Sequence, residues 1–118
     1  MKRAKIVIFC ILMLNIAQAK DLTQADLNQA ASQHYSSSDF MLNKAYKQLM
    51  GVLEKDRKGE LKKAQEAWLK FRDLNAKFIA NGYKGGSIAP LIQYQALIEL
   101  TQNRTAELTK MHLEAITP

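Results

Sequence analysis

The stretch "LKKAQEAWLKFRDLNAKFIA", residues 61–80, decides the fold. Mostly apolar side chains recur in it at alternating spacings of three and four residues, the period of one helix face: Leu61, Ala64, Trp68, Phe71, Asn75 and Phe78. Charged side chains cover the other face: Lys62, Lys63, Glu66, Lys70, Asp73 and Lys77. The spacing predicts a long amphipathic helix over residues 60–80, with the first set turned toward a core.

Glycine and proline mark the end of this helix and the start of the next. The segment "NGYKGGSIAP", residues 81–90, contains three glycines and a proline, which favour turns. Pro90 suits the first turn of a helix, and Ser87 is a possible cap. The last helix is expected from about residue 90 to 113, with this inward face: Leu91, Tyr94, Leu97, Ile98, Thr101, Thr105 and Leu108.

Two more helical segments precede residue 60. Residues 39–53 carry one apolar stripe, followed by a charged connection over residues 56–59: Leu42, Tyr46, Leu49, Met50 and Leu53. Residues 23–35 predict a short polar helix that Thr23 caps, and the serines at 36–38 are expected to break and restart the chain. The expected fold is all-α: a small antiparallel bundle of three long helices plus a short N-terminal helix.

The first 19 residues have the pattern of a cleavable signal peptide. Lys2, Arg3 and Lys5 precede an apolar run over residues 6–16, and Ala17-Gln18-Ala19 supplies a cleavage site. That run is too short to span a bilayer, which takes ~20 residues. We therefore expect residues 20–118 to form a single domain in the bacterial periplasm or outside the cell, without stable membrane insertion.

Charge and cysteine content exclude several classes of function. The chain of 118 residues has 17 basic and 11 acidic residues, a net charge of +6, and removal of the three basic residues of the signal lowers this to +3 (14 minus 11). Basic and acidic residues are interleaved, which argues against nucleic acid as a partner. The one cysteine, Cys10, lies in the signal, so the exported chain offers neither a disulfide nor a thiolate metal site.

The sequence offers no catalytic constellation. Its two histidines, His34 and His112, lie near opposite ends of the exported chain and in no metal-binding motif. Ser87 lacks the Gly-x-Ser-x-Gly context of a nucleophile elbow. We therefore expect no catalytic residue, no metal and no cofactor, and a protein that is not an enzyme.

The Trp-Arg-Asp cluster of residues 61–80 has two interpretations. One flank of the helix carries Gln65, Trp68, Arg72 and Asn75. Trp68 and Arg72 would be either anchors of a binding surface or a core tryptophan with an arginine packed on it, and we favour the second. Asp73 is turned about 100° from Arg72. The two are therefore expected to pair with other helices and not with each other, and Arg104 is a candidate neighbour of Asp73 or of the polar pair Asp39 and Asn43.

The glycine-rich connection is the candidate binding loop: Tyr83, Lys84, Gly85, Gly86 and Ser87. It combines one aromatic ring, one cation, a hydroxyl and bare backbone amides, which could enter a cleft and donate to carboxylates. The alternative is a plain helix connection that needs a positive φ at Gly85 or Gly86.

Four linked motifs give the sequence a family resemblance. "DFMLNKAY" (39–46), "LKKAQEAWLKFRD" (61–73), "GGSIAP" (85–90) and "ALIELTQNRTAEL" (96–108) stand in the order and spacing of the LprI-like family, whose best-known activity is inhibition of lysozyme. The resemblance covers about residues 23–108. Besides Gly86 and Ser87 of the loop, these residues match its pattern, and we expect them to be structural: Asp39, Leu42, Asn43, Tyr46, Gln65, Trp68, Arg72, Asp73, Thr101 and Arg104.

The resemblance implies an exported helical domain with a lysozyme as a possible partner. The hypothesis is a non-catalytic inhibitor that blocks the cleft of a lysozyme or another muramidase. The alternative is a periplasmic interaction or assembly module with no enzyme target, which uses the exposed side of the helix over 60–80 or the charged face of the helix over 39–53. Members of the family commonly carry cysteines where this chain has Ala30, Ala76 and Ala96, so here stability must come from packing.

Overall fold

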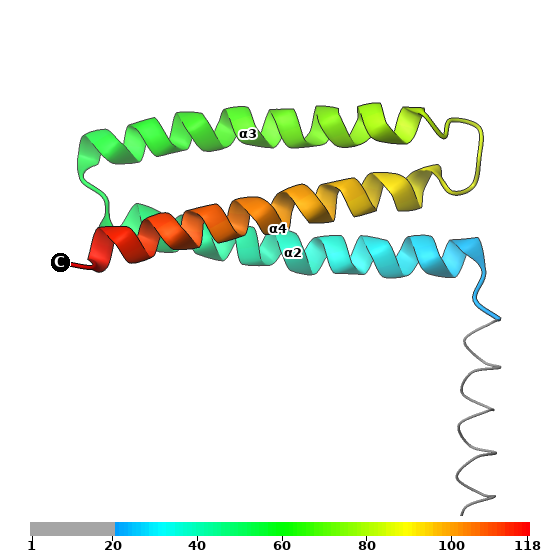
Figure 1. Cartoon of the computed structure of the whole chain (residues 1–118), viewed down its shortest axis with the longest axis horizontal. Coiled ribbons are helices and arrows are strands. Elements are labelled where there is room, and N and C mark those ends of the chain that lie inside the picture. Colours follow the sequence, from blue (N-terminus) through cyan, green and yellow to red (C-terminus); the bar gives the residue numbers. More distant parts are fainter. Residues whose placement is uncertain (1–20) are drawn as a thin grey trace, which may run out of the picture.

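Three long helices form the part of the protein, residues 21–118, that the computed structural model describes. They are α2 (Gln24–Val52), α3 (Lys55–Asn81) and α4 (Ala89–Ile116), and residues 21–118 contain no strand. Each helix runs antiparallel to the one before it, so that α2 and α4 point the same way (Figure 1). The all-α bundle of three long helices is thus confirmed. The predicted signal peptide lies outside the described residues.

The prediction of a separate short N-terminal helix is wrong, because α2 runs without a break through the three serines. The Ser36 hydroxyl donates a hydrogen bond to the Ser32 carbonyl at 3.1 Å, and the Ser38 side chain is buried. Serine is only slightly unfavourable in a helix, by about half a kcal/mol each, and the packing of a continuous helix outweighs that cost. Thr23 caps α2 as predicted, in a capping box with Asp26.

The connection between α2 and α3 is shorter than the charged segment predicted for it. It consists of Leu53 and Glu54, and the predicted linker residues 56–59 form the first turns of α3. Asp56 in the first turn interacts favourably with the positive end of the helix, and Arg57 pairs with Glu60 at 3.5 Å. These local gains offset the cost of Gly59 inside the helix, which is about 1 kcal/mol.

The turn into α4 agrees with the glycine and proline signals but not with the predicted cap. Gly85 has a φ of 91°, the conformation that glycine adopts without strain, and Pro90 lies in the first turn of α4. Ile88, not Ser87, precedes the helix, and no side chain caps it.

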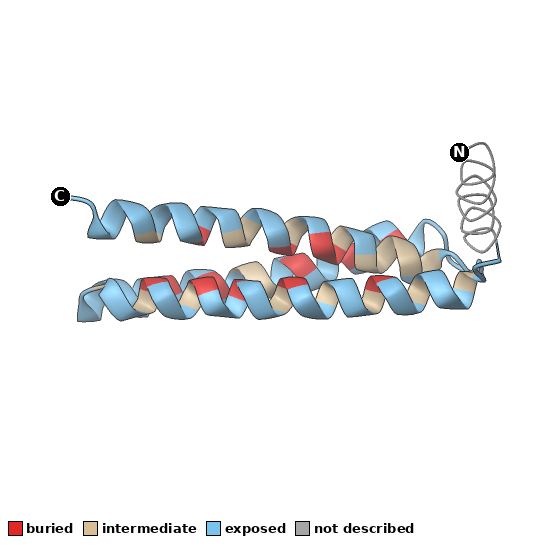
Figure 2. Ribbon diagram, turned by 90° about the horizontal axis from the view of Figure 1, so that it is seen from below, coloured by how far each residue is buried: buried red, intermediate tan, exposed pale blue. Residues whose placement is uncertain are grey.

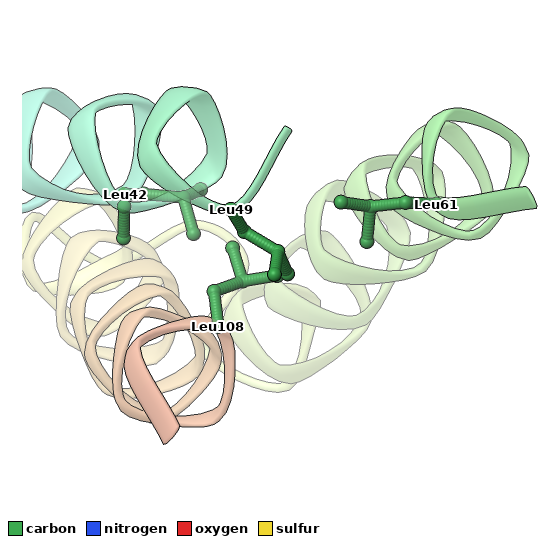
Figure 3. Close-up of a cluster of buried hydrophobic side chains, with 5 residues drawn as sticks. Leu42, Leu49, Leu61 and Leu108 are labelled. Carbon is green, nitrogen blue, oxygen red and sulfur yellow. The ribbon is translucent and has the colours of Figure 1, made fainter. Parts of the chain in front are cut away.

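Leucines of all three helices form the apolar core. Leu42 and Leu49 of α2 point toward Leu108 of α4, and Leu61 of α3 points toward the same space (Figure 3). Leu42 and Leu108 have no exposed surface. The predicted inward sides of α2 and α4 are buried or half-buried throughout, and α4 packs against both other helices, more extensively against α2.

The predicted inward face of α3 is only partly correct. Leu61 is buried and Trp68 is half-buried, but the side chains of Phe71 and Phe78 are 54% and 77% exposed. The face toward the bundle instead carries these residues: Leu61, Gln65, Arg72, Ala76 and Ala80. The residues of this face are mostly small or polar, and spacing alone could not show which of two stripes turns inward. Buried residues lie on the facing sides of the helices, and the outer sides are exposed (Figure 2).

None of the helices in residues 21–118 is both long enough and apolar enough to cross a membrane.

A proline in the serine segment tests the continuity of α2. Ser37 is exposed in mid-helix, so Ser37→Pro should lower the free energy of unfolding by about 3 kcal/mol or more by breaking a backbone hydrogen bond and clashing with the preceding turn. Ser37→Ala is the control and should leave stability unchanged or slightly higher. Urea denaturation in which the proline variant is as stable as the alanine variant would mean that the chain breaks at the serines.

The capping box predicts a pH-dependent contribution at the start of α2. Hydrogen bonds from the Thr23 backbone and side chain lower the pKa of Asp26 below its ordinary value of 3.8. A lowered folded-state pKa stabilises the protein above the ordinary value, and this stabilisation is lost as pH falls through the lowered pKa. Asp26→Asn should therefore lower the melting temperature slightly near neutral pH and have a vanishing effect in strong acid. An effect that is constant with pH would contradict the role of the carboxylate.

Candidate functional site

A buried arginine joins the three helices at the centre of the bundle. The side chain of Arg72 on α3 is 6% exposed. Its Nη1 donates to Asp39 Oδ1 of α2 at 3.1 Å and to Thr101 Oγ1 of α4 at 3.4 Å, and its Nε donates to Asp73 Oδ1 at 2.9 Å. A guanidinium can serve several acceptors at once because its donors are fixed in a planar fork. One side chain thus contacts α2 and α4 from α3.

Aromatic rings enclose the same guanidinium. The Arg72 Cζ lies 5.4 Å from the ring centroid of Tyr35 and 5.4 Å from that of Trp68, both within the range of cation–π attraction. Tyr35 in turn packs against Tyr94 of α4, with centroids 6.1 Å apart. Trp68 is half-buried and borders the leucine core.

The ionisation of this cluster reflects burial and charge together. Burial would lower the pKa of Arg72, but hydrogen bonds to Asp73 and Asp39 outweigh it and raise that pKa, so the guanidinium stays charged. Burial raises the pKa of the Tyr35 phenol, and the nearby Arg72 charge offsets only part of this. Neither group titrates near neutral pH, so the cluster is a fixed structural charge and not an acid–base pair.

A second arginine extends the cluster along α4. Arg104 Nε donates to Gln65 Oε1 of α3 at 3.0 Å, and its Nη1 pairs with Glu107 Oε2 at 2.9 Å. Its Cζ lies 6.0 Å from the Trp68 ring. Within the described residues every buried side-chain nitrogen or oxygen has a hydrogen-bond partner.

Two predicted pairings in this cluster are wrong. Arg72 and Asp73 do pair with each other, because the long arginine side chain brings its Nε within reach of a neighbouring carboxylate although the two Cα–Cβ bonds diverge. Arg104 contacts neither Asp73 nor Asp39, since Arg72 occupies the space between α2 and α3 and leaves Gln65 and Glu107 to Arg104.

The structure brings together most of the residues that carry the family resemblance. Asn43 donates to Asp39 Oδ2 at 3.4 Å, and Tyr46 packs against the leucine core. These join the two arginines, their partners and Trp68 in one continuous cluster. These contacts favour a structural role, in which the residues hold the helices together. That role stays a prediction.

The candidate binding loop, residues 83–87, lies apart from this cluster, and each of its residues is exposed. It lies at the end of the bundle where α2 begins (Figure 1). Asn28 Nδ2 of α2 donates to the Ser87 carbonyl at 3.2 Å, and the Gly86 amide donates to the Tyr83 carbonyl at 3.1 Å. The Gly86 amide is therefore engaged within the loop, contrary to the expectation of free amides.

Other parts of the described chain bring no catalytic groups together. No group of three or more potential metal-ligating His, Cys, Asp or Glu residues occurs in residues 21–118. A hollow of about 550 Å³ lies at the opposite end of the bundle, and its lining includes the apolar Leu49 and Leu61. Two of its charged lining residues, Arg57 and Glu60, pair with each other, and a third, Arg104, is held by Gln65 and Glu107.

Sequence reasoning missed two residues of these sites. Tyr35 was placed at the end of a short helix and not beside Arg72, and only a continuous α2, with Tyr35 one turn before Asp39, would have indicated the contact. Asn28, which supports the loop from 59 residues away in sequence, gives no local signal at all.

These features define a class: a small helical domain with a satisfied polar core and an exposed glycine-rich loop. The profile of the family described as "Lysozyme inhibitor LprI" matches residues 15–108. A protein of Rhizobium meliloti (strain 1021), described as uncharacterized, is 35% identical over 105 residues, with 78% of this chain and 76% of the relative covered. No solved structure matches the chain. The chain belongs to the LprI lysozyme-inhibitor family.

A double-mutant cycle tests the bond between α3 and α2. Asp39→Asn and Arg72→Met, alone and combined, should show a coupling energy of about 1–2 kcal/mol, because the pair is charge-assisted and its arginine is buried, with 6% exposure against 37% for Asp39. The exposed Arg57–Glu60 pair, with both side chains 68% exposed, is the matched control and should couple by less than about 0.5 kcal/mol. Equal coupling of the two pairs in urea denaturation would contradict a special role for Arg72.

Proposed function

We propose that this protein is exported and binds a lysozyme, whose cleft it blocks with the loop Tyr83–Ser87. Membership in the LprI family, which is described as a lysozyme inhibitor, is the observation that carries this proposal. Within residues 21–118, the loop is the segment that combines exposed residues, an aromatic ring and a cation at one end of the bundle.

The chemistry of the loop suits the cleft of a glycoside hydrolase. Such enzymes place two carboxyl groups about the scissile bond. The Lys84 ammonium and the Ser87 hydroxyl are donors that can bind these carboxyl groups, and the Tyr83 ring, 49% exposed, can stack where a sugar ring would lie. The inhibitor offers no glycosidic bond between the carboxyl groups, so occupancy alone blocks hydrolysis.

Local contacts hold the loop in shape before any partner binds. The Gly86 amide closes a turn on Tyr83, Gly85 supplies the positive φ, and Asn28 anchors the Ser87 carbonyl to α2. A loop that is ordered in advance loses less conformational entropy on binding. The family resemblance at Gly86 and Ser87 is consistent with this use.

The net positive charge of this chain indicates that short-range contacts, and not long-range attraction, would provide the affinity for a lysozyme. After removal of the predicted signal the net charge is +3 (14 minus 11). Electrostatic steering of such a chain toward a basic lysozyme would be weak, so complementarity of the loop must supply the affinity. A less basic muramidase of the cell envelope would be the better-matched target.

A second candidate function is an envelope interaction or assembly module without an enzyme target. The observation that favours it is the apolar outer face of α3, where Phe71, Leu74 and Phe78 are exposed.

Truncation of the loop side chains tests the proposed inhibition. The protein is secreted from a host through its own leader, purified and titrated against lysozymes of several classes in a cell-wall lysis assay. The native chain should inhibit at least one class at near-stoichiometric ratio, and Lys84→Ala with Ser87→Ala should lose about tenfold or more in potency. Its melting temperature should not change, because both side chains are exposed.

Lys110→Ala provides the matched control, since Lys110 is an exposed lysine on α4 far from the loop. It should inhibit like the native chain. Inhibition that survives the loop substitutions would move the binding surface elsewhere, and failure of the native chain against every lysozyme class would sink the proposal.

A further inference from the structure

The outer face of α3 carries an apolar seam that no part of residues 21–118 covers. It consists of Ala64, Ala67, Phe71, Leu74 and Phe78, and all five are exposed, with the three large side chains 54%, 59% and 77% exposed. Their steps of three, four, three and four residues equal the a and d positions of a heptad repeat. The buried face of α3, with Ala76 and Gln65, lies on the other side of the helix.

A row of lysines borders this α3 seam. Lys63, Lys70 and Lys77 each precede an a-position residue by one, which is the g position of the heptad, and all three are exposed. Residues at the g position face the flank of a paired helix, so their charge determines which charged residues that helix must carry there. On the other flank the seam meets Trp68 and Asn75, which are half-buried in the bundle.

We propose that the α3 seam docks an acidic amphipathic helix of a partner protein. The apolar side chains of that helix would pack between Phe71, Leu74 and Phe78, and its glutamates or aspartates would face the lysine row. Charge complementarity identifies this occupant, since three lysines in register demand acids at the matching positions.

A second copy of this chain does not meet that demand. In an antiparallel pair of α3 helices the lysine rows of the two copies would face each other. In a parallel pair each row would face the Trp68 and Asn75 positions of the other copy, which carry no acid. Repulsion between the lysine rows disfavours the antiparallel pair, and the lack of acidic partners for the lysines disfavours the parallel pair.

An anionic membrane surface is also a poorer match. Helices that lie in the lipid interface have a wide apolar face and basic residues over the polar face. Here the apolar seam is narrow, lysines border it on one side only, and Glu66 and Asp73 form the next row beyond them. These acids weaken the attraction to anionic lipid.

Synthetic helices of known charge test the proposal on the secreted full-length product. One peptide of about three heptads carries Leu at a and d and Glu at e and g, and a control peptide carries Lys at e and g; like charges keep each from pairing with itself. Calorimetric titration should show binding of the acidic peptide, weakened by salt, and no binding of the basic one. Leu74→Ser with Phe78→Ser should weaken binding by about ten- to a hundredfold.

Two further variants make the test specific. Lys70→Glu with Lys77→Glu should exchange the preference, so that the basic peptide binds and the acidic one does not. Phe40→Ser removes an equally exposed ring, 68% exposed on α2, and should bind like the native chain. All substituted side chains are exposed, so the melting temperatures should stay the same.

The outcomes separate this proposal from inhibition of lysozyme. Seam variants should inhibit lysozyme like the native chain, and the Lys84→Ala, Ser87→Ala variant should bind the acidic peptide normally. Equal binding of both peptides, binding of neither, or an unchanged preference after charge reversal would overturn the proposal. It is also overturned if sedimentation shows a dimer that Phe78→Ser dissociates, or if phosphatidylglycerol vesicles bind and the acidic peptide does not.

Discussion

The buried guanidinium of Arg72 is the interaction on which the arrangement of the three helices depends. The helices α2 and α4 pack extensively on each other, with Leu42, Leu49 and Leu108 between them. The fully buried apolar residues of α3 are few and, apart from Leu61, small, while Trp68 and Leu69 are partly buried against the leucine core. Because little fully buried apolar area attaches α3, the hydrogen bonds of Arg72 to α2 and α4 add substantially to its attachment, each worth about 1.5–3 kcal/mol for a charged group.

This constraint also positions the candidate binding loop. The loop leaves the end of α3 and enters α4, so its place relative to α2 depends on where Arg72 holds α3. The bond from Asn28 to the Ser87 carbonyl then fixes the loop to the start of α2. The polar cluster and the loop therefore play separate parts: the first sets the scaffold, and the second is the surface proposed to meet a lysozyme.

Attachment through a polar cluster also explains why α3 has two contrasting faces. Its inner face needs polar and small residues, with Arg72 and Ala76 as examples, so its large apolar residues Phe71, Leu74 and Phe78 remain outside. In an ordinary bundle these three side chains would lie in the core. Their exposure beside a lysine row makes α3 both a structural element and a candidate docking surface.

The sequence predicted the helices better than the relations between them. Strong apolar stripes gave the inward faces of α2 and α4, and Gly85 and Pro90 marked the turn, because these signals act locally. Periodicity placed Phe71 and Phe78 inside since it cannot weigh a second stripe of small and polar residues. The serine segment was predicted to break because propensity omits the packing that favours a continuous α2.

The sequence predicted which residues belong to the polar cluster, but not which of them pair with each other. The residue types of the cluster were identified, but which acceptor each arginine takes depends on helix spacing in three dimensions. The lengths of the Arg72 and Arg104 side chains allow several partners at any such spacing. Contacts such as Tyr35 with Arg72 required knowing that α2 does not break.

Hydrogen exchange in Arg72→Met tests the central role of the guanidinium most directly. If Arg72 attaches α3 to the pair of α2 and α4, the amides of Ala76 and Ala80 should exchange about tenfold faster or more, as expected for the loss of one charged hydrogen-bonding group. The amides of Leu42 and Leu108 should keep their protection. Unchanged exchange in α3, or an equal loss of protection in all three helices, would contradict the claim that this side chain holds α3 in place.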